Sequence, residues 1–246
     1  MPVHANIEPL LWESEFFQLK CAKLHFSHTA PPVHLADLQP WALVQAKVPA
    51  HCLGDIDALS KLGFQLAEGE INFSLMPGAD HAAAVLADNI NNSLIRPAVK
   101  SDIPLLHRCA THVFVFSRFR APWYNERDSG RFYATWIEKA VLGTFDDQCL
   151  LALNEKGQPQ GFVTLRATAQ TEACLGLFAV FPDARGQGVG RRLIQAAKQW
   201  CLQQRRHPLG ITTQLSNIAA IRLFISSGAM AESTAYWLYR GQNDSI

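Results

Sequence analysis

The sequence predicts a mixed α/β fold, in which helices flank a central β-sheet and a smaller α/β domain precedes the main one. Apolar runs typical of strands alternate with helical segments along residues 94–240. Two of these runs are joined by a short polar segment typical of a β-hairpin, which adds antiparallel pairing to the sheet. A polar stretch at 77–93 is expected to be a linker that separates the N-terminal domain, 1–76, from the main domain, 94–240.

The main domain is expected to begin with a strand, Leu94–Pro97, followed by a helix that starts near Ser101 and Pro104. Ser101 can cap that helix, and proline is tolerated in the first turn because its missing N–H has no helical partner there. A helix over Phe132–Leu142 follows and ends at Gly143.

The remaining elements again alternate between strands and helices. The hairpin joins Cys149–Leu153 to Gln160–Thr168. A helix over Gly188–Arg205 carries an apolar stripe with the spacing of a core-facing helix, and Pro208 lies just beyond its end. The other expected elements are the strands Ala173–Phe181, Leu209–Leu215 and Ser233–Tyr239 and the helix Asn217–Ser227.

The composition favours a cytoplasmic globular protein. Hydrophobic residues make up 48% of the chain, charged residues 17%, and the formal net charge is +1. A chain so near neutral has no global field to attract nucleic acid or a membrane surface, so we expect neither as a partner. No run approaches the roughly 20 apolar residues of a membrane helix, and Met1–Leu10 lacks the pattern of a secretion signal. The six cysteines form no CxxC pair and lie at no zinc-ligand spacing, which predicts buried free thiols and no metal site.

The segment Arg185-Gly186-Gln187-Gly188-Val189-Gly190-Arg191-Arg192 has the features of an anion-binding turn. It follows an expected strand and opens an expected helix. Glycines let backbone N–H groups approach a ligand closely, and a helix N-terminus adds unpaired donors and a partial positive charge. Together these features predict a diphosphate site, to which the arginines can add charge-assisted contacts. The alternative is a glycine-rich turn with solvated arginines.

Two commoner phosphate motifs do not fit this segment. A P-loop ends in Gly-Lys-Ser/Thr, whereas Gly190 precedes two arginines. The dinucleotide fingerprint needs a glycine at position 191 and an acidic residue about 20 positions further on, and the chain has neither.

The wider context resembles the GNAT superfamily of acetyltransferases over about residues 94–240. The superfamily's acetyl-CoA signature, Gln/Arg-x-x-Gly-x-Gly/Ala, is matched by Arg185, Gly188 and Gly190, and the pattern that begins at Asn217 resembles its next helix. The resemblance implies a mostly antiparallel sheet, acetyl-CoA as co-substrate, and backbone N–H groups near Phe178 that stabilise the developing oxyanion. The cofactor-binding residues that it implies are Phe178, Ala179, Val180, Arg185, Gly186, Gln187, Gly188, Val189, Gly190, Arg191 and Asn217.

A narrower resemblance covers the substrate side. Residues 117–124, 129–138 and 232–240, with 7–17 in the N-terminal region, are similar to acetyltransferases of enterobacterial common antigen synthesis. This implies that the acceptor is the 4-amino group of dTDP-4-amino-4,6-dideoxy-galactose and that the protein is a homodimer. The N-terminal region lacks a counterpart of the glycine-rich turn, so we expect it to support the substrate side without binding CoA.

The residues of 117–131 suit such a substrate. Arg118, Arg120 and Arg131 can hold its two phosphates, and Trp123 or Tyr124 can stack on thymine. The alternative is that the aromatic rings belong to the core and the arginines to a solvated face.

The sequence leaves the catalytic acid and base unassigned. The superfamily usually has a tyrosine as general acid seven residues after the position of Asn217, and this chain has Phe224 there. A phenyl ring cannot donate a proton, so water or Tyr236 would protonate the leaving thiolate, although Tyr236 also fits a core strand position. Glu138 and Glu232 are available as bases, and both also fit surface positions. Acetylation of another amine and a non-catalytic acyl-CoA sensor remain the alternative functions.

Overall fold

The computed structural model describes residues 2–78, 94–168 and 171–241. Its strands are β1 (Ala5–Pro9), β2 (Cys21–Phe26), β3 (Leu43–Pro49), β4 (Gln65–Leu75), β5 (Ile95–Pro97), β6 (Gln148–Leu153), β7 (Pro159–Ala167), β8 (Ala173–Val180), β9 (Leu209–Gln214) and β10 (Met230–Gly241). Its α-helices are α1 (Leu11–Phe17), α2 (Leu35–Leu38), α3 (Leu53–Lys61), α5 (Ile103–Val113), α6 (Asp128–Val141), α7 (Val189–Gln203) and α8 (Ile218–Ser226). Within the described ranges these strands form one ten-stranded sheet, in the order β1-β2-β3-β10-β4-β9-β8-β7-β6-β5.

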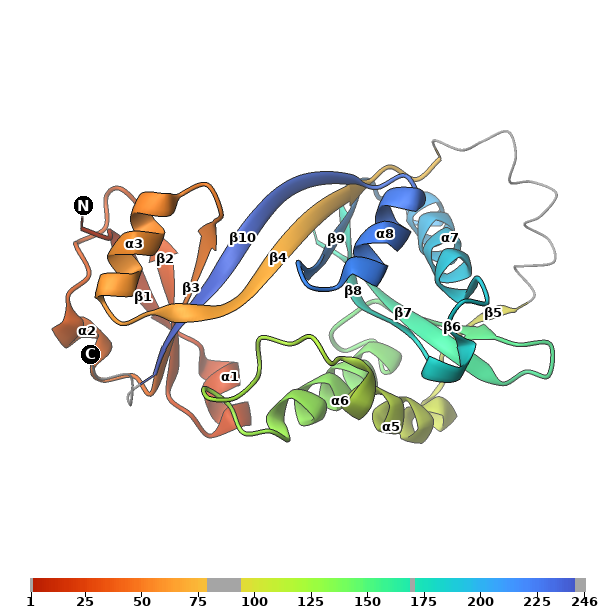
Figure 1. Ribbon diagram of the computed structural model, residues 1–246. Coiled ribbons are helices and arrows are strands. Elements are labelled where there is room, and N and C mark those ends of the chain that lie inside the picture. The colour runs from red at the N-terminus through yellow and green to blue at the C-terminus, as the bar shows by residue number, and fades with distance from the viewer. Residues whose placement is uncertain (1, 79–93, 169–170, 242–246) are drawn as a thin grey trace.

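Two long strands carry the sheet from the N-terminal part of the chain to the C-terminal part (Figure 1). Strand β10 pairs antiparallel with β3 on one side and with β4 on the other, and β4 pairs antiparallel with β9. The two expected domains therefore contribute to the same sheet. Their division at the linker stays a prediction, because residues 79–93 of the linker lie outside the described residues.

The sheet is mostly antiparallel, as the sequence predicts, with parallel pairs at β2–β3 and β8–β9. The β8–β9 pair is short: it joins Ala173 to Leu209 and Cys174 to Gly210. Beyond Cys174 the two strands have no pairing with each other in the described residues. The sheet is therefore split at this point, which is where the candidate site lies.

Helices cover the two faces of the split region. Figure 1 shows α5 and α6 on one face and α7 and α8 on the other. The apolar stripe predicted for α7 is confirmed, because Val189, Leu193 and Ala197 are almost fully buried in the cluster on its face of the sheet. The opposite face packs α5 and α6 through Leu106 and Ile137.

The expected start of α5 is wrong in one respect. Ser101 lies in a short 3₁₀ turn, Lys100–Asp102, that precedes the helix, and it caps nothing. The N-cap position of α5 is held by Asp102, whose carboxylate makes no cap bond to the helix and stabilises the preceding turn: it accepts the Val99 N–H at 2.8 Å and two bonds from the Arg96 guanidinium at 2.7 and 2.8 Å. The carboxylate thus accepts three hydrogen bonds, one more than the two lone pairs of a serine hydroxyl could accept.

Helix α6 begins at Asp128, four residues before the expected start at Phe132. The helix includes Gly130, at a point where α5 passes close by: a Cβ at Gly130 would lie 3.1 Å from the backbone oxygen of Thr111. Gly130 therefore permits helix packing and does not interrupt the helix.

The cysteines are free thiols, as the sequence predicts. Cys21, Cys149 and Cys201 are buried, whereas Cys52, Cys109 and Cys174 are partly exposed, so the expectation of burial holds for three of them. Among the described residues no group of His, Cys, Asp and Glu side chains is placed to hold a metal ion. No helix in the same ranges is long and apolar enough to cross a membrane.

Candidate active site

The split between β8 and β9 borders a cavity of about 450 Å³ that is lined from both faces of the sheet. On one face it is lined by Asn217 and Phe224, at the N-terminus and in the body of α8. On the other face it is lined by Arg118, Tyr133 and Phe116, from the α5–α6 connection and α6. The wall of the cavity therefore offers side chains from both faces of the sheet to a bound reactant.

Strand β8 presents bare backbone to this cavity at Gly176. A Cβ at Gly176 would lie 2.6 Å from both Asp146 Oδ2 and Thr164 Oγ1, so only glycine fits without a shift. The Thr164 hydroxyl also accepts the Leu177 N–H at 2.7 Å, which fixes the strand at this point. Oxyanion stabilisation requires rigidly held backbone donors beside the reacting atoms, and the Leu177 N–H is not one of them because Thr164 already accepts it.

The three strand residues expected to bind the cofactor are placed differently. Phe178 lines the cavity, whereas the side chains of Ala179 and Val180 pack in the clusters on opposite faces of the sheet. A cofactor on the α7–α8 side could contact Ala179 only through backbone atoms, whereas the partly buried side chain of Val180 lies on that side.

The glycine-rich turn has the geometry of an anion cradle. Gly186 and Gly188 have φ angles of 75° and 74°, and a Cβ at either would meet open space. Gly188 directly precedes α7, whose first backbone N–H groups have no helical acceptor. This arrangement fits a diphosphate, because it combines unobstructed backbone with the positive end of a helix dipole.

The other residues of the turn divide into surface and packing positions. Gln187, Gly188 and Arg191 line a second cavity, of about 670 Å³, beside the β6–β7 hairpin. Arg185 is exposed, whereas the Val189 side chain is buried. A Cβ at Gly190 would lie 2.9 Å from Leu223 Cδ2, so this glycine lets α7 approach α8.

Arg192 has structural partners of its own. Its guanidinium donates to the Leu153 carbonyl at 3.0 Å and to Gln160 Oε1 at 2.7 Å, so it holds α7 against the hairpin.

Asn217 and Phe224 lie on the α8 side of the cavity. Asn217 caps α8 through Oδ1, which accepts the Ala220 N–H at 3.3 Å, and its Nδ2 donates to Thr213 Oγ1. The Phe224 ring is 2% exposed and contacts Phe73 and Phe178. Phe224 is therefore both a core residue and part of the cavity wall.

Tyr236, which the sequence offers as a proton donor to the leaving thiolate, lies on β10 next to Trp237, and Trp237 lines the cavity. Successive strand residues point to opposite faces, so Tyr236 points away from the substrate half, toward Gly69.

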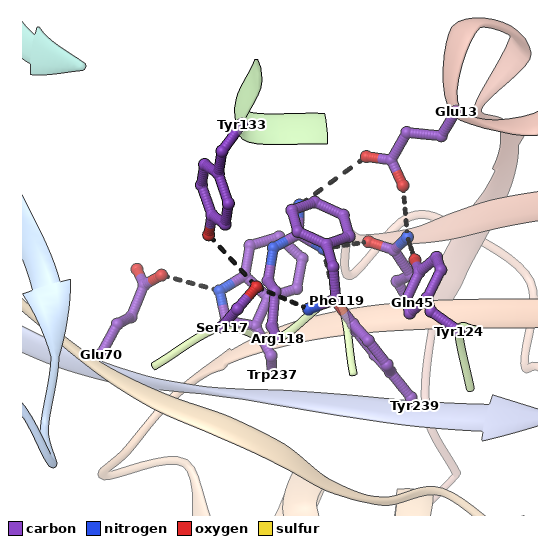
Figure 2. Close-up of polar contacts among 10 residues, drawn as sticks. All are labelled: Glu13, Gln45, Glu70, Ser117, Arg118, Phe119, Tyr124, Tyr133, Trp237 and Tyr239. Carbon is purple, nitrogen blue, oxygen red and sulfur yellow. Dashed lines mark hydrogen bonds and ion pairs between the residues drawn. The ribbon is translucent and has the colours of Figure 1, made fainter. Parts of the chain in front are cut away.

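Arg118 lies in a polar network on the substrate half of the cavity (Figure 2). Its guanidinium donates to Gln45 Oε1 at 2.8 Å and to the Tyr239 hydroxyl, and it lies 3.7 Å from Glu13. The guanidinium also stacks against Phe119 and Trp237, 4.2 and 4.1 Å from the ring centroids. Burial raises the pKa of Tyr239 to about 12, so its hydroxyl stays protonated beside Arg118.

The structure does not gather the three predicted phosphate-binding arginines in one place. Arg118 lines the cavity, whereas Arg120 donates to the Ala67 carbonyl and stacks on Trp123. Arg131 is 56% exposed and pairs with Asp128 at 3.1 Å. A shared role in binding one diphosphate stays a prediction, and Arg118 is the member best placed for it.

The two aromatic residues proposed to stack on thymine are also separated. Tyr124 is 5% exposed, its ring contacts Phe17 and Phe119, and its hydroxyl accepts a bond from Gln45 at 3.0 Å. Trp123 is half-buried against Tyr239. Of the two positions that the sequence allows for Tyr124, thymine stacking and the core, the structure shows the core. Stacking of its ring on a base would require the core to open.

Sequence reasoning missed several residues that line the cavity: Glu68, Glu70, Phe116, Tyr133, Arg166 and Trp237. For two of these residues the sequence does contain a signal. The spacing Glu68-x-Glu70 within a strand places two carboxylates on the same face of the sheet. The two carboxylates that the sequence offers as bases do not line this cavity. Glu138 pairs with His107 at 3.0 Å on the surface, and Glu232 is exposed.

Comparison with known proteins agrees with the observed fold. The sequence profile of the acetyltransferase (GNAT) family matches residues 113–228. The chain belongs to this family of acetyltransferases. It is 44% identical, over 98% of its own length and 100% of the relative's, to dTDP-fucosamine acetyltransferase of Escherichia coli O6:H1.

Two solved structures illustrate the shared fold. A GCN5-related N-acetyltransferase from Sphaerobacter thermophilus superposes with a TM-score of 0.57 at 16% identity, over 83% of this chain and 61% of that one. A tandem GNAT protein from the clavulanic acid biosynthesis pathway superposes with a TM-score of 0.59 at 14% identity, over 92% of this chain and 76% of that one. At these identities the likeness concerns the fold alone.

Proposed function

We propose that this protein transfers the acetyl group of acetyl-CoA to the 4-amino group of dTDP-4-amino-4,6-dideoxy-galactose, in enterobacterial common antigen synthesis. The observation that carries the proposal is the 44% identity, across the whole chain, to a dTDP-fucosamine acetyltransferase. The cavity at the split supports it, because its lining comes from both faces of the sheet and can hold one reactant from each face beside β8.

Acetyl-CoA fits the α7–α8 face. The turn at Gly186 and Gly188 and the N-terminus of α7 would hold its diphosphate, with Gln187 and Arg191 beside it. The pantetheine would lie along β8 in the split, with Asn217 on the other side. When bound, acetyl-CoA supplies a thioester carbonyl as the electrophile.

The sugar nucleotide would occupy the α5–α6 face. Arg118 and Arg166 line this half of the cavity and can attract the diphosphate, and Phe116, which is 42% exposed, offers a ring for the base. Most of the rate would come from positioning the amine against the carbonyl and from backbone N–H groups near Phe178 that stabilise charge on the carbonyl oxygen.

The absence of a tyrosine at position 224 does not prevent this chemistry. A thiol has a pKa near 8.5, so a thiolate leaves with much less help from an acid than an alkoxide needs. Water that enters the cavity can protonate the sulfur.

The experiment is a steady-state assay of CoA release from acetyl-CoA. We expect turnover with the 4-amino sugar nucleotide and none with the matched nucleotide that has a hydroxyl at C4. Turnover with a polyamine, an amino acid or a protein N-terminus, and none with the sugar nucleotide, would contradict the proposed substrate. Binding of acetyl-CoA without turnover on any amine would favour a sensor.

We further propose that the protein works as a homodimer in the cytoplasm, where acetyl-CoA is made. The family resemblance supports the homodimer, and sedimentation of the purified protein at several concentrations tests it.

A further inference from the structure

Acetylation of an amine needs a group that takes a proton from the ammonium form before the nitrogen can attack. Six titratable side chains line the described wall of the cavity: Glu68, Glu70, Arg118, Tyr133, Arg166 and Cys174. Arginine stays protonated in proteins. Burial raises the pKa of the Tyr133 hydroxyl and of the Cys174 thiol, which keeps both protonated. The two carboxylates of β4 remain as acceptors.

Glu70 already has partners for both of its carboxylate oxygens. Its Oε2 accepts the indole N–H of Trp237 at 2.7 Å, a bond drawn in Figure 2, and its Oε1 forms an ion pair with Lys47. The side chain is 10% exposed. Glu70 is therefore bound to a cation and a donor that hold it in place, and it serves to position Trp237.

Glu68 lies two residues earlier on β4, on the same face of the sheet. One of its oxygens, Oε1, accepts the N–H of Gly69 at 2.9 Å, and within the described residues no side chain bonds to the other. Pairing between β4 and β9 ends at Glu70 and Gln214, so Glu68 lies just past the end of β9, where it lines the cavity. It is half-buried and opposite Trp237 in the β10 register.

We infer that Glu68 binds the ammonium group of the acceptor and takes its first proton. This inference rests on the proposed transfer to an amine and names the residue that makes the amine nucleophilic. The carboxylate becomes a carboxylic acid as the ammonium becomes an amine, and the proton then leaves to solvent. The amine forms the C–N bond, the C–S bond breaks with its electron pair on sulfur, and the second N–H proton reaches the thiolate through water. Overall, ammonium and thioester give amide, thiol and one proton.

The test compares Glu68→Gln with the parent protein. Glutamine keeps the size of the side chain and the bond from Gly69, but it cannot take the proton. We expect kcat/KM for the amino sugar nucleotide to fall by about 10²- to 10⁴-fold at neutral pH, with an unchanged Kd for acetyl-CoA and an unchanged Tm. The loss should shrink as pH rises, because solvent then supplies the free amine. Tyr133 and Arg118 face the same cavity and are present in both proteins.

The matched control is Glu172→Gln, which changes an exposed carboxylate just before β8 and should leave kcat/KM within about twofold of the parent. A Glu68→Gln protein that keeps kcat/KM within about threefold at all pH values would overturn the assignment. If the parent acetylates a different amine, the substrate proposal fails by itself, and Glu68→Gln is then compared on that amine. An equal loss of kcat/KM on that amine supports Glu68 as the group that takes the proton, and an unchanged kcat/KM refutes this role.

Discussion

The guanidinium of Arg118 lies 4.1 Å from the ring centroid of Trp237, so a cation from the α5–α6 connection stacks on an aromatic ring from β10. The same Trp237 donates its indole N–H to Glu70 on β4. Three segments far apart in the sequence thus meet on the substrate side of the cavity. Changes to Arg118 should therefore affect both the stability of the fold and the binding of the sugar nucleotide.

We predict that Arg118→Ala lowers the free energy of unfolding by about 2–3 kcal/mol, because it leaves Glu13, Gln45 and Tyr239 without their shared donor. The KM for the sugar nucleotide should rise, and the KM for acetyl-CoA should stay the same. Urea denaturation and steady-state kinetics measure the two effects. Arg131→Ala is the control: its side chain is 56% exposed, so its ion pair should contribute at most about 1 kcal/mol. A stable Arg118→Ala protein with parental kinetics would contradict the prediction.

Gly188→Val should weaken the binding of acetyl-CoA. The substitution places a branched side chain in the open space of the turn and imposes a φ of 74° that β-branched residues rarely adopt. Calorimetric titration gives the Kd. Gly143→Val is the control. Gly143 also has a φ of 67° and open space around it, so the backbone strain is similar, but it lies after α6 and outside the glycine-rich turn. Equal Kd values for the parent, Gly188→Val and Gly143→Val would refute the role of the turn.

Phe224→Tyr should be at least as active as the parent and should differ from it in stability by less than about 1 kcal/mol, because the ring borders the cavity and its hydroxyl can reach water there. Phe73→Tyr is the control: Phe73 is also 2% exposed and contacts Phe224. Its hydroxyl would be buried without a partner and should cost about 1–3 kcal/mol. Turnover and Tm are measured together. If Phe224→Tyr loses as much stability as Phe73→Tyr without gaining activity, the ring is sealed from the cavity.

Asp102→Asn should destabilise the protein near neutral pH but have little effect in acid. Hydrogen bonds from Arg96 lower the pKa of Asp102 below its ordinary 3.8. A lowered folded-state pKa gives stability that is present above the unfolded-state pKa and is lost as pH falls through the folded-state value. The difference in unfolding free energy between parent and variant should therefore be constant above about pH 5 and shrink below about pH 4. Ser101→Ala is the control and should change stability by less than about 0.5 kcal/mol at every pH. A Ser101→Ala effect as large as that of Asp102→Asn would restore serine as the cap.

The features that could be predicted from the sequence are local ones. The stripe on α7, the β6–β7 hairpin and the glycine turn each depend on residues close together in the chain, and the structure places all three as expected. The shared sheet could not be predicted, because pairing of β10 with β3 joins Ala235 to Pro49 and no local pattern records such a distance.

The substrate side could be predicted only in part, for a related reason. The run 117–124 contains arginines and aromatic rings that suit a nucleotide, but their partners come from α1 and β3. Glu13 and Gln45 decide that Arg118 and Tyr124 belong to one buried network, and neither residue lies near them in the sequence. Glu68 could not be predicted as a site residue, because strand β4 belongs to the N-terminal region, which the sequence indicates only as a support for the substrate side.

The central place of β10 also governs how the protein is made. Of the described strands it is the last to leave the ribosome, yet it lies between β3 and β4, which are synthesised more than 150 residues earlier. Until residues 230–241 emerge, β3 and β4 each present an unpaired edge, and such edges invite pairing with other chains. Trp237 enters the cavity only with this strand. A chain released early from the ribosome would therefore lack the continuous sheet and the wall of the candidate site together.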